Sequence, residues 1–288
     1  SKTRIASGSG LIPEKERARL MNMSGGNRAF RLLAEWLNDP AIDEETKAEL
    51  QEIADNPAEV EDRFFRELEF GTGGLRGVMG AGTNRINRYT VRKATLGLAR
   101  YLQEEARRND SREGEAAGKE KTPSVVIAYD SRHRSPEFAL EAALVLAGNG
   151  VKSYLFTTLR PTPELSFAVR HLRADAGIVI TASHNPPEYN GYKVYGADGG
   201  QLVPRDAEKV IEHIRRIRSF GEIRSLAREE AERSGMLEWI GAEVDQAFAE
   251  SVLAPRREPD VFSRAQDQFA VVYTPLHGAG NRPVRTVL

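Results

Sequence analysis

The sequence predicts an α/β fold in which a three-layer, mixed and largely parallel sheet carries helices on both faces and is followed by the start of a second similar domain. Between residues 124 and 181, short β-branched runs alternate with helical stretches over short links, which is typical of right-handed strand–helix–strand crossovers. The 288 residues, 40% hydrophobic and 29% charged, have the composition of a soluble globular chain of one large or two ordinary domains.

We divide the chain into an extended or helical amino-terminal segment (1–40), a first domain (41–225) and the start of a second domain (226–288). The apolar spacing and the Gly and Pro positions first predict an extended segment over 1–27, then helices over 29–37, 43–54 with Asp43 as N-cap, 58–68 and 90–108 with Thr90 as N-cap, and a mobile surface loop over 109–122. Strands are then predicted over 124–129, 151–156, 176–181, 193–195 and 201–203, and helices over 135–147, 162–172 and 206–219. A hinge over 220–235, a helix over 242–253 and a strand over 269–273 complete the chain.

Charge and composition exclude several classes of function. The 41 Lys and Arg residues nearly cancel the 42 Asp and Glu residues, so we expect neither a nucleic-acid nor a membrane partner. No apolar run reaches the length of a membrane span, and no signal peptide is visible, which makes a cytoplasmic location the expectation. The absence of cysteine excludes disulfides and thiolate chemistry.

The segment from Thr181 to Pro186 is the strongest candidate for a catalytic loop. It follows a buried strand, and Asn190 and Gly191 after it favour a turn, so Ser183 is expected on a tight loop at the carboxyl end of that strand. In open α/β sheets this edge is where ligands bind. His184 and Lys193 place a proton acceptor and a cation close to the serine hydroxyl. A polar turn with an incidental serine is the alternative.

A glycine-rich stretch over 71–77 is a second candidate site. Its glycines, Gly73 and Gly74 among them, allow the backbone to approach a ligand closely and to form an anion-binding nest of N–H groups. Arg76 adds a forked cation that suits phosphate oxygens. The stretch is not a Walker A loop, because no Gly-Lys-Ser/Thr follows. A plain β-turn is the alternative.

Three further residues at strand ends are weaker candidates for binding phosphate or substrate. Asp130 and Arg132 follow the strand over 124–129, where such a pair equally often braces a loop. His277 lies in a turn after the predicted strand over 269–273 and has a structural alternative.

A serine next to a histidine is compatible with two reaction classes. Acyl transfer needs a G-x-S-x-G nucleophile elbow and an acid partner for the histidine, and Ser183 has no flanking glycines. Phosphoryl transfer needs positioning and positive charge around the moving group. Arg76, Arg132, His184 and Lys193 supply that charge, so the residues favour phosphoryl transfer.

The motifs together resemble the α-D-phosphohexomutase superfamily, the phosphoglucomutases and phosphomannomutases. Five segments occur in the family's order: Phe70–Gly77, Ala128–Arg132, Thr181–Pro186, Asn190–Lys193 and Thr274–Gly278. The sequence around Phe70–Gly77 is most similar to that of the subgroup of bacterial phosphoglucomutases that also includes phosphoglucomutase-2-like and phosphopentomutase enzymes. The D-G-D-x-D-R metal segment of the family is absent, so we expect this chain to be the amino-terminal half of an enzyme and inactive alone.

The resemblance implies a specific reaction. Phosphorylated Ser183 would exchange its phosphoryl group with a hexose 1- or 6-phosphate through a bisphosphate, with glucose favoured over mannose or pentose and glucose 1,6-bisphosphate as activator. It makes Lys193 the general acid/base, helped by His184, and Arg76, Gly73, Gly74 and Asn185 phosphate contacts. Mg²⁺ would be held by the Ser183 phosphate and by aspartates outside this chain, in carboxy-terminal domains of the same enzyme. A non-catalytic sugar-phosphate-binding module is the alternative from another class.

Overall fold

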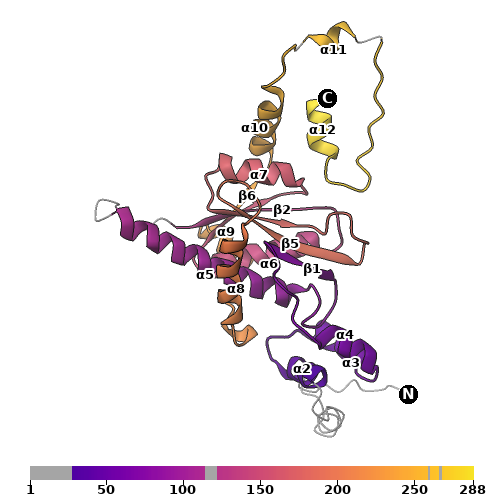
Figure 1. Ribbon diagram of the computed structural model, residues 1–288, viewed down its shortest axis with the longest axis vertical. Coiled ribbons are helices and arrows are strands. Elements are labelled where there is room, and N and C mark those ends of the chain that lie inside the picture. The colour runs from indigo at the N-terminus through magenta and orange to yellow at the C-terminus, as the bar shows by residue number, and fades with distance from the viewer. Residues whose placement is uncertain (1–27, 114–121, 259, 266–267) are drawn as a thin grey trace.

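A six-stranded mixed sheet forms the centre of the protein (Figure 1). The computed structural model describes residues 28–113, 122–258, 260–265 and 268–288. The strands, in their order across the sheet, are β1 (Gly74–Val78), β5 (Tyr189–Gly196), β4 (Ala176–Ile180), β2 (Ser124–Tyr129), β3 (Lys152–Phe156) and β6 (Leu237–Ile240). The last four run parallel, whereas β1 and β5 are antiparallel to their neighbours, which confirms the predicted mixed, largely parallel sheet.

Helices cover both faces of this sheet, as predicted (Figure 1). One face carries α5 (Arg88–Glu113), α6 (Ser135–Gly148), α8 (Pro204–Arg215) and the short α9 (Arg228–Arg233), and the other carries α7 (Thr162–His171) and α10 (Ala242–Leu253). The residues of β2 and β4 are buried throughout, because helices cover both sides of these central strands. The short βα and αβ links therefore bring the carboxyl ends of β2 and β4 to one edge of the sheet.

Three amino-terminal helices form a separate apolar cluster against α5. They are α2 (Arg28–Asn38), α3 (Glu44–Ile53) and α4 (Pro57–Phe64). Trp36 lies at its centre, 5.7 Å from the ring of Phe64 and 5.5 Å from that of Tyr89. Asp43 caps α3 by accepting from the Thr46 N–H, as predicted. Burial opposes ionisation of Asp43, but hydrogen bonds from Thr46, Tyr89 and Arg88 outweigh it and lower the pKa to about 2.

Two helix boundaries in this part differ from the prediction. The helix expected over 58–68 ends at Phe64, because the Leu68 N–H donates to the Thr83 carbonyl instead of a helical one. Helix α5 begins at Arg88, and Asn87 rather than Thr90 receives its first N–H groups. It also continues to Glu113, into the predicted surface loop. The predicted extended segment over 1–27 and residues 114–121 of the predicted loop lie outside the described residues.

The sheet continues past the predicted end of the first domain. The helix expected over 206–219 ends at Arg215, and a capping box between Ser219 and Glu222 starts a short 3₁₀ helix, η1 (Phe220–Glu222). Helix α9 and strand β6 follow within the predicted hinge and beyond it, and β6 pairs with β3. The division of the chain into domains remains a prediction.

The carboxyl-terminal part is an extended arm with two short helices, α11 (Val261–Arg264) and α12 (Asn281–Val287) (Figure 1). The predicted helix over 242–253 is confirmed as α10. The predicted strand over 269–273 is wrong: its described residues pair with no strand, and Val272 is 99% exposed. The apolar pattern is present, but a strand also needs a hydrogen-bonded neighbour. Within the described ranges, no helix has the length and apolar composition needed to cross a bilayer.

Candidate active site

Ser183 lies just past the carboxyl end of β4, on an exposed loop. The Thr181 N–H still donates to the Gly191 carbonyl, so the chain leaves the sheet only after this residue. Ser183 then adopts a left-handed backbone with φ of +57°, a conformation that costs a non-glycine residue about 1–2 kcal/mol. Its side chain is exposed, and Oγ lies 3.3 Å from Nδ1 of the neighbouring His184. The predicted pair of serine and histidine therefore lies together at the carboxyl edge of the sheet.

The Thr181 hydroxyl and the Asp130 carboxylate hold the backbone of Ser183 through two consecutive hydrogen bonds. The Ser183 N–H donates to Thr181 Oγ1 at 3.0 Å. That hydroxyl donates in turn to Asp130 Oδ2 at 2.6 Å, which joins the loop to the end of β2. The Asp130 N–H donates to the Ile180 carbonyl at 3.1 Å. Asp130 is therefore oriented toward the serine loop from the neighbouring strand.

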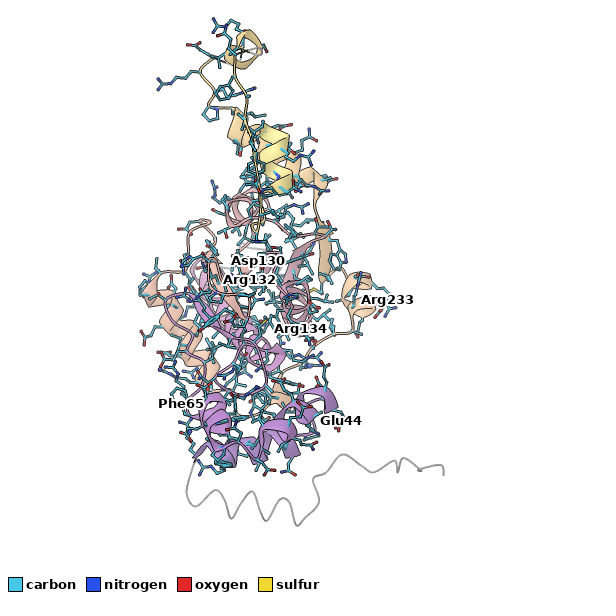
Figure 2. The ribbon with its side chains drawn as sticks, turned by 90° about the vertical axis from the view of Figure 1, so that its right-hand side faces the viewer. Glu44, Phe65, Asp130, Arg132, Arg134 and Arg233 are labelled. Atoms are coloured by element: carbon cyan, nitrogen blue, oxygen red, sulfur yellow. The ribbon has the colours of Figure 1, made fainter. Side chains whose placement is uncertain are left out.

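Arg132 holds the same loop through its carbonyl oxygens. Nη2 donates to Ser183 O at 2.9 Å and to Asn185 O at 2.6 Å, and Nη1 donates to Pro186 O at 2.8 Å and to Tyr189 O at 3.1 Å. Its Nε lies 3.4 Å from Asp130 Oδ2, and Figure 2 shows the two residues side by side. This geometry is the loop-bracing alternative for the pair. A role of either residue in binding phosphate stays a prediction.

Two buried polar residues complete this network, and their role was not foreseen from the sequence. Ser135 Oγ donates to Asp130 Oδ1 at 2.7 Å, and Asn190 Nδ2 donates to Ser135 Oγ at 2.9 Å. Both residues are 0% exposed. The sequence does place a polar residue directly after a buried strand or at the first turn of the next helix. This pattern indicates a hydrogen bond but does not show which residue the side chain bonds to.

The Asn190-Gly191 pair lies inside β5 rather than in a turn, which corrects the prediction. The side-chain oxygen Oδ1 of Asn190 accepts a hydrogen bond from the Gly191 N–H at 2.8 Å. Gly191 is required there because a Cβ would lie 2.4 Å from the Thr181 carbonyl oxygen. The strand expected over 193–195 is therefore β5, and the hairpin strand expected over 201–203 is reduced to one bridge between Tyr195 and Gln201.

Lys193 lies in β5 opposite Val179 of β4, so both side chains leave the same face of the sheet. Its side chain is half-buried, and within the described ranges no carboxylate lies within ion-pair distance of it. The adjacent Tyr192 is buried on the other face and accepts from Thr95 Oγ1 at 3.1 Å. Burial raises the pKa of the Tyr192 phenol, which stays neutral and anchors β5 to α5.

The glycine-rich stretch is half strand, and an anion-binding nest formed by its N–H groups stays a prediction. The Gly71 N–H donates to the Gly74 carbonyl, and the Gly73 N–H donates to Gly71 O. From Gly74 onward the chain is β1, paired with β5. Gly74 is a glycine because a Cβ there would lie 2.1 Å from the Tyr192 carbonyl oxygen. Close packing on β5 explains this glycine, and phosphate contact by Gly73 or Gly74 stays a prediction.

Arg76 of β1 reaches the serine loop across β5. Its side chain is exposed, and Nη1 donates to Asn185 Oδ1 at 3.3 Å. Its guanidinium makes no other hydrogen bond among the described residues, so most of its donors face solvent beside Asn185. The structure therefore brings Arg76, Asn185 and Ser183 to one exposed edge.

His277 approaches the site through its backbone. Its carbonyl oxygen accepts from Ser131 Oγ at 3.1 Å, which places the arm after α10 beside the loop at the end of β2. The imidazole is exposed. Whether it contacts a ligand stays a prediction.

The site carries positive charge without a preformed metal centre. Arg76 and Arg132 bond to the serine loop, His184 is part of it, and Lys193 lies on β5 opposite Val179. The nearby carboxylate of Asp130 is engaged by hydrogen bonds. Among the described residues, no three or more His, Asp or Glu side chains are grouped to hold a metal ion. No carboxylate in those ranges bonds to His184, so the acid partner that acyl transfer needs is missing there.

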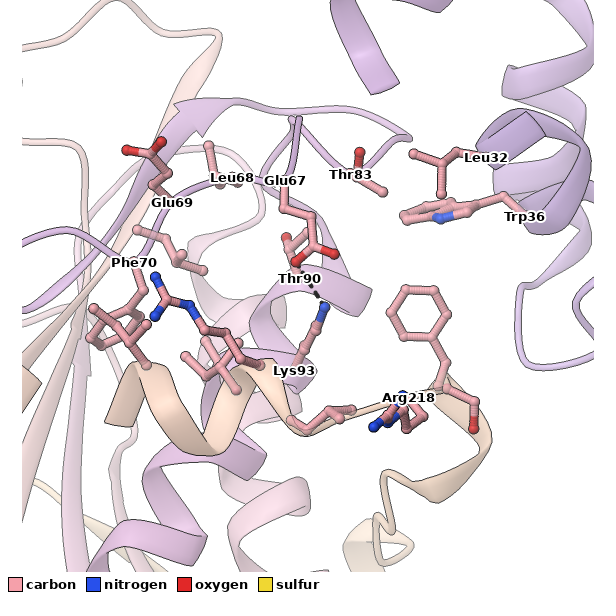
Figure 3. A pocket seen from close by; sticks show the side chains of 18 of the residues that line it. Leu32, Trp36, Glu67, Leu68, Glu69, Phe70, Thr83, Thr90, Lys93 and Arg218 are labelled. Carbon is pink, nitrogen blue, oxygen red and sulfur yellow. Dashed lines mark hydrogen bonds and ion pairs between the residues drawn. The ribbon is translucent and has the colours of Figure 1, made fainter. Parts of the chain in front are cut away.

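A cavity of about 650 Å³ lies away from this edge, between α2, the segment before β1, α5 and α8 (Figure 3). Trp36, Phe70 and Phe220 form much of its apolar wall. The charged pair inside it, Lys93 and Glu67, is joined at 2.9 Å. We keep the serine loop and not this cavity as the candidate site, because Ser183, His184 and Lys193 do not line the cavity and only Gly71 and Leu75 of the glycine-rich stretch do.

A second charged cluster lies near the carboxyl edge on the other face of the sheet, between α7 and α10. Arg160 is 1% exposed and donates two hydrogen bonds to the Asp245 carboxylate, at 2.6 Å from Nε and 2.9 Å from Nη2. Glu164 lies beside them, also 1% exposed, with Oε1 in an ion pair 3.6 Å from Arg160 Nε but with no hydrogen bond to either carboxylate oxygen. Arg282 of α12 adds a bond to Asp245 at 3.3 Å. This cluster was not foreseen from the sequence.

Comparison with known proteins shows the family to which the chain belongs. Residues 67–220, just over half of the chain, match the family described as phosphoglucomutase/phosphomannomutase, alpha/beta/alpha domain I. The chain belongs to the phosphoglucomutase/phosphomannomutase family. It is 40% identical over 220 residues to a phosphoglucomutase of Staphylococcus haemolyticus, covering 76% of this chain and 36% of that protein. A phosphoglucomutase of Staphylococcus aureus is 48% identical over 159 residues, covering 55% of this chain and 26% of that protein.

Solved structures of this family have the same fold. A putative phosphomannomutase from Thermus thermophilus matches with a TM-score of 0.59 and 27% identity, over 77% of this chain and 43% of that one. The parafusin phosphoglucomutase of Paramecium, at 14% identity and a TM-score of 0.58, covers 77% of this chain and 41% of that one and supports the fold alone. The chain thus spans about a quarter to a third of the length of the curated relatives named here. The predicted family and fold class are confirmed.

Proposed function

We propose that the whole protein is an intramolecular phosphotransferase that interconverts hexose 1-phosphate and hexose 6-phosphate, with glucose as the favoured sugar. Ser183 carries the phosphoryl group between turnovers, and a hexose bisphosphate is the intermediate. One observation carries this proposal: an exposed serine is held in a left-handed backbone at the carboxyl edge of the sheet, and Arg76 and Arg132 reach its loop from neighbouring elements. The membership of the chain in the phosphoglucomutase/phosphomannomutase family supports the same reading.

The geometry supports a balanced transfer step. A sugar hydroxyl attacks the phosphorus on Ser183, the Oγ–P bond breaks, and a new sugar O–P bond forms. The sugar hydroxyl gives its proton to a base, for which Lys193 is our candidate, and His184 lies 3.3 Å from Oγ to protonate the departing serine oxygen. Arg76 stabilises the negative charge on the moving phosphoryl group. After the bisphosphate reorients, the reverse step returns the other phosphate to Ser183.

The described residues do not fit a magnesium site by themselves, because they offer no cluster of carboxylates and the carboxylate of Asp130 is occupied by three hydrogen bonds. Membership in the family implies a metal-dependent enzyme. We propose the Ser183 phosphate as one Mg²⁺ ligand, with aspartates outside this chain as the others. Partner domains of the same enzyme and a cytoplasmic location belong to the same proposal.

Two alternatives stay open within the proposal. A phosphopentomutase or phosphomannomutase would use the same serine with another sugar. A sugar-phosphate-binding module without catalysis would keep the cationic edge and leave Ser183 unmodified. The sugar is decided by parallel incubations with the 1,6-bisphosphates of glucose and mannose and with ribose 1,5-bisphosphate.

The test is phosphorylation of Ser183 in the whole protein as its gene encodes it. The protein is incubated with glucose 1,6-bisphosphate and Mg²⁺, and phosphopeptides are mapped by mass spectrometry. We expect phosphate on Ser183, none in Ser183→Ala, and a wild-type yield in Ser131→Ala, which removes another exposed hydroxyl at the same edge. Absence of phosphate from wild-type Ser183 with every bisphosphate would refute the mutase and favour the binding module.

A further inference from the structure

The backbone of Ser183 is held on both sides by side chains, one from Arg132 beyond the end of β2 and one from Thr181 at the end of β4. Its carbonyl accepts from Arg132 at 2.9 Å, and its N–H donates to the Thr181 hydroxyl at 3.0 Å. The residue has φ of +57°, which its own side chain does not favour. Something in the surroundings must therefore select this conformation, since an unconstrained serine would leave it.

The direction of each hydrogen bond around Thr181 follows from the donors available. A hydroxyl has one proton and two lone pairs. Asp130 Oδ2, at 2.6 Å, is an acceptor that takes the proton, so the lone pairs of Thr181 Oγ1 remain to accept the Ser183 N–H. The carboxylate thus fixes the hydroxyl in the orientation that the serine backbone needs.

Asp130 is itself held so that it cannot turn away. Its Oδ1 accepts from Ser135 Oγ at 2.7 Å and from the Arg132 N–H at 3.0 Å. Ser135 is 0% exposed and Thr181 8% exposed, so water has little access to compete for these bonds. The relay from the start of α6 through Asp130 to Thr181 ends on the one backbone N–H that sets the direction of the Ser183 side chain.

We propose that Thr181 is a positioning residue for phosphoryl transfer, whose hydroxyl, oriented by Asp130, holds Ser183 in the left-handed conformation that presents Oγ to the substrate. This inference rests on the proposed function. Thr181 is nearly buried and follows β4 directly, so it acts through Ser183 and not by touching the sugar. A displacement of the carrier oxygen of about 1 Å lowers transfer rates by about 100-fold.

The test compares Thr181→Val, which keeps the shape and removes the hydroxyl, with Thr181→Ser, which restores the hydroxyl. Both are made in the whole protein and assayed with glucose 1,6-bisphosphate and glucose 1-phosphate. We expect Thr181→Val to lower kcat about 100-fold with KM changed less than about threefold, and Thr181→Ser to stay within about fivefold of wild type. Amide hydrogen exchange of the peptide over 181–189 is measured in parallel and should be faster in Thr181→Val only.

The outcomes separate this inference from the proposed function. If wild type is phosphorylated on Ser183 and Thr181→Val transfers at the same rate, the positioning role is refuted and the mutase stands. If Thr181→Ser is as slow as Thr181→Val, the methyl group rather than the hydroxyl matters, and the proposal is again overturned. If wild type is never phosphorylated, the proposed function fails, and unchanged exchange in Thr181→Val would refute the positioning of the loop as well.

Discussion

Two clusters of arginine and carboxylate lie near the carboxyl edge of the sheet, and they differ in how completely their polar atoms are paired. In the serine-loop cluster, both oxygens of Asp130 accept hydrogen bonds and Arg132 donates four to carbonyls of one loop. In the helix cluster, Arg160 and Asp245 are paired, but Glu164 is buried with neither oxygen hydrogen-bonded.

The two degrees of pairing correspond to two different roles. A network whose members are all satisfied fixes one conformation, which an exposed loop with a strained serine requires. A buried carboxyl without a hydrogen-bond donor avoids the charged form instead. Burial raises the pKa of Glu164 to about 8, and the neighbouring Asp245 adds to that effect. The serine-loop cluster therefore specifies geometry, whereas for the helix cluster we expect the stability of the junction of α7 and α10 to depend on pH.

The largest effect is expected from removing the shared cation of the helix cluster. Arg160→Met leaves Asp245 and Glu164 without their buried partner and should lower the free energy of unfolding by about 3–5 kcal/mol in urea titrations. Arg282→Met is the matched control: it removes one bond to the same Asp245 from a side chain 60% exposed. It should cost at most about 1 kcal/mol. Equal losses in the two variants would show that Arg160 has no special role.

A smaller loss is expected in the serine-loop cluster from Asp130→Asn. The three donors that face Asp130 require two acceptor oxygens, and an amide would turn its NH₂ toward at least one of them. We expect a loss of about 1–3 kcal/mol in urea unfolding and slower phosphorylation of Ser183. Asp198→Asn, on an exposed turn, should change stability by less than about 0.5 kcal/mol. A fully active and stable Asp130→Asn protein would contradict the account.

The smallest effect is a change in pH dependence with Glu164→Gln. Because the folded pKa of Glu164 lies above its ordinary value of 4.5, its contribution to stability is complete below pH 4.5 and is lost as the pH rises through about 8. The variant lacks this titration. Wild-type stability should therefore fall relative to the variant between about pH 5 and 8. Parallel curves from urea unfolding at each pH would contradict the prediction.

The sequence predicts the parts of the fold that local pattern controls. The alternation of β2, α6, β3, α7 and β4 is marked by β-branched runs, Pro at first helical turns and Gly at exits, and all five elements lie where expected. The cap at Asp43 is equally local, because its acceptor serves an N–H three residues away.

The parts that depend on distant partners escape the sequence. Glycines of 71–77 indicate a loop, yet pairing with β5 makes half of them a strand. The apolar run over 269–273 indicates a strand, yet it has no neighbour to pair with among the described residues. For the site, Ser183 and His184 are adjacent in sequence and foreseeable, whereas the relay joins Thr181 to Asp130 across 51 residues. Hydrogen-bond partners at that separation leave no periodic pattern.

The most direct measurement is the stoichiometry of phosphate on Ser183, read by intact-mass and peptide mass spectrometry after incubation of the whole protein with glucose 1,6-bisphosphate. We expect close to one phosphate per chain in wild type, none in Ser183→Ala, and a much slower rise to the same level in Thr181→Val. A wild-type protein that takes up no phosphate, or that carries it on a residue other than Ser183, would contradict the central claim.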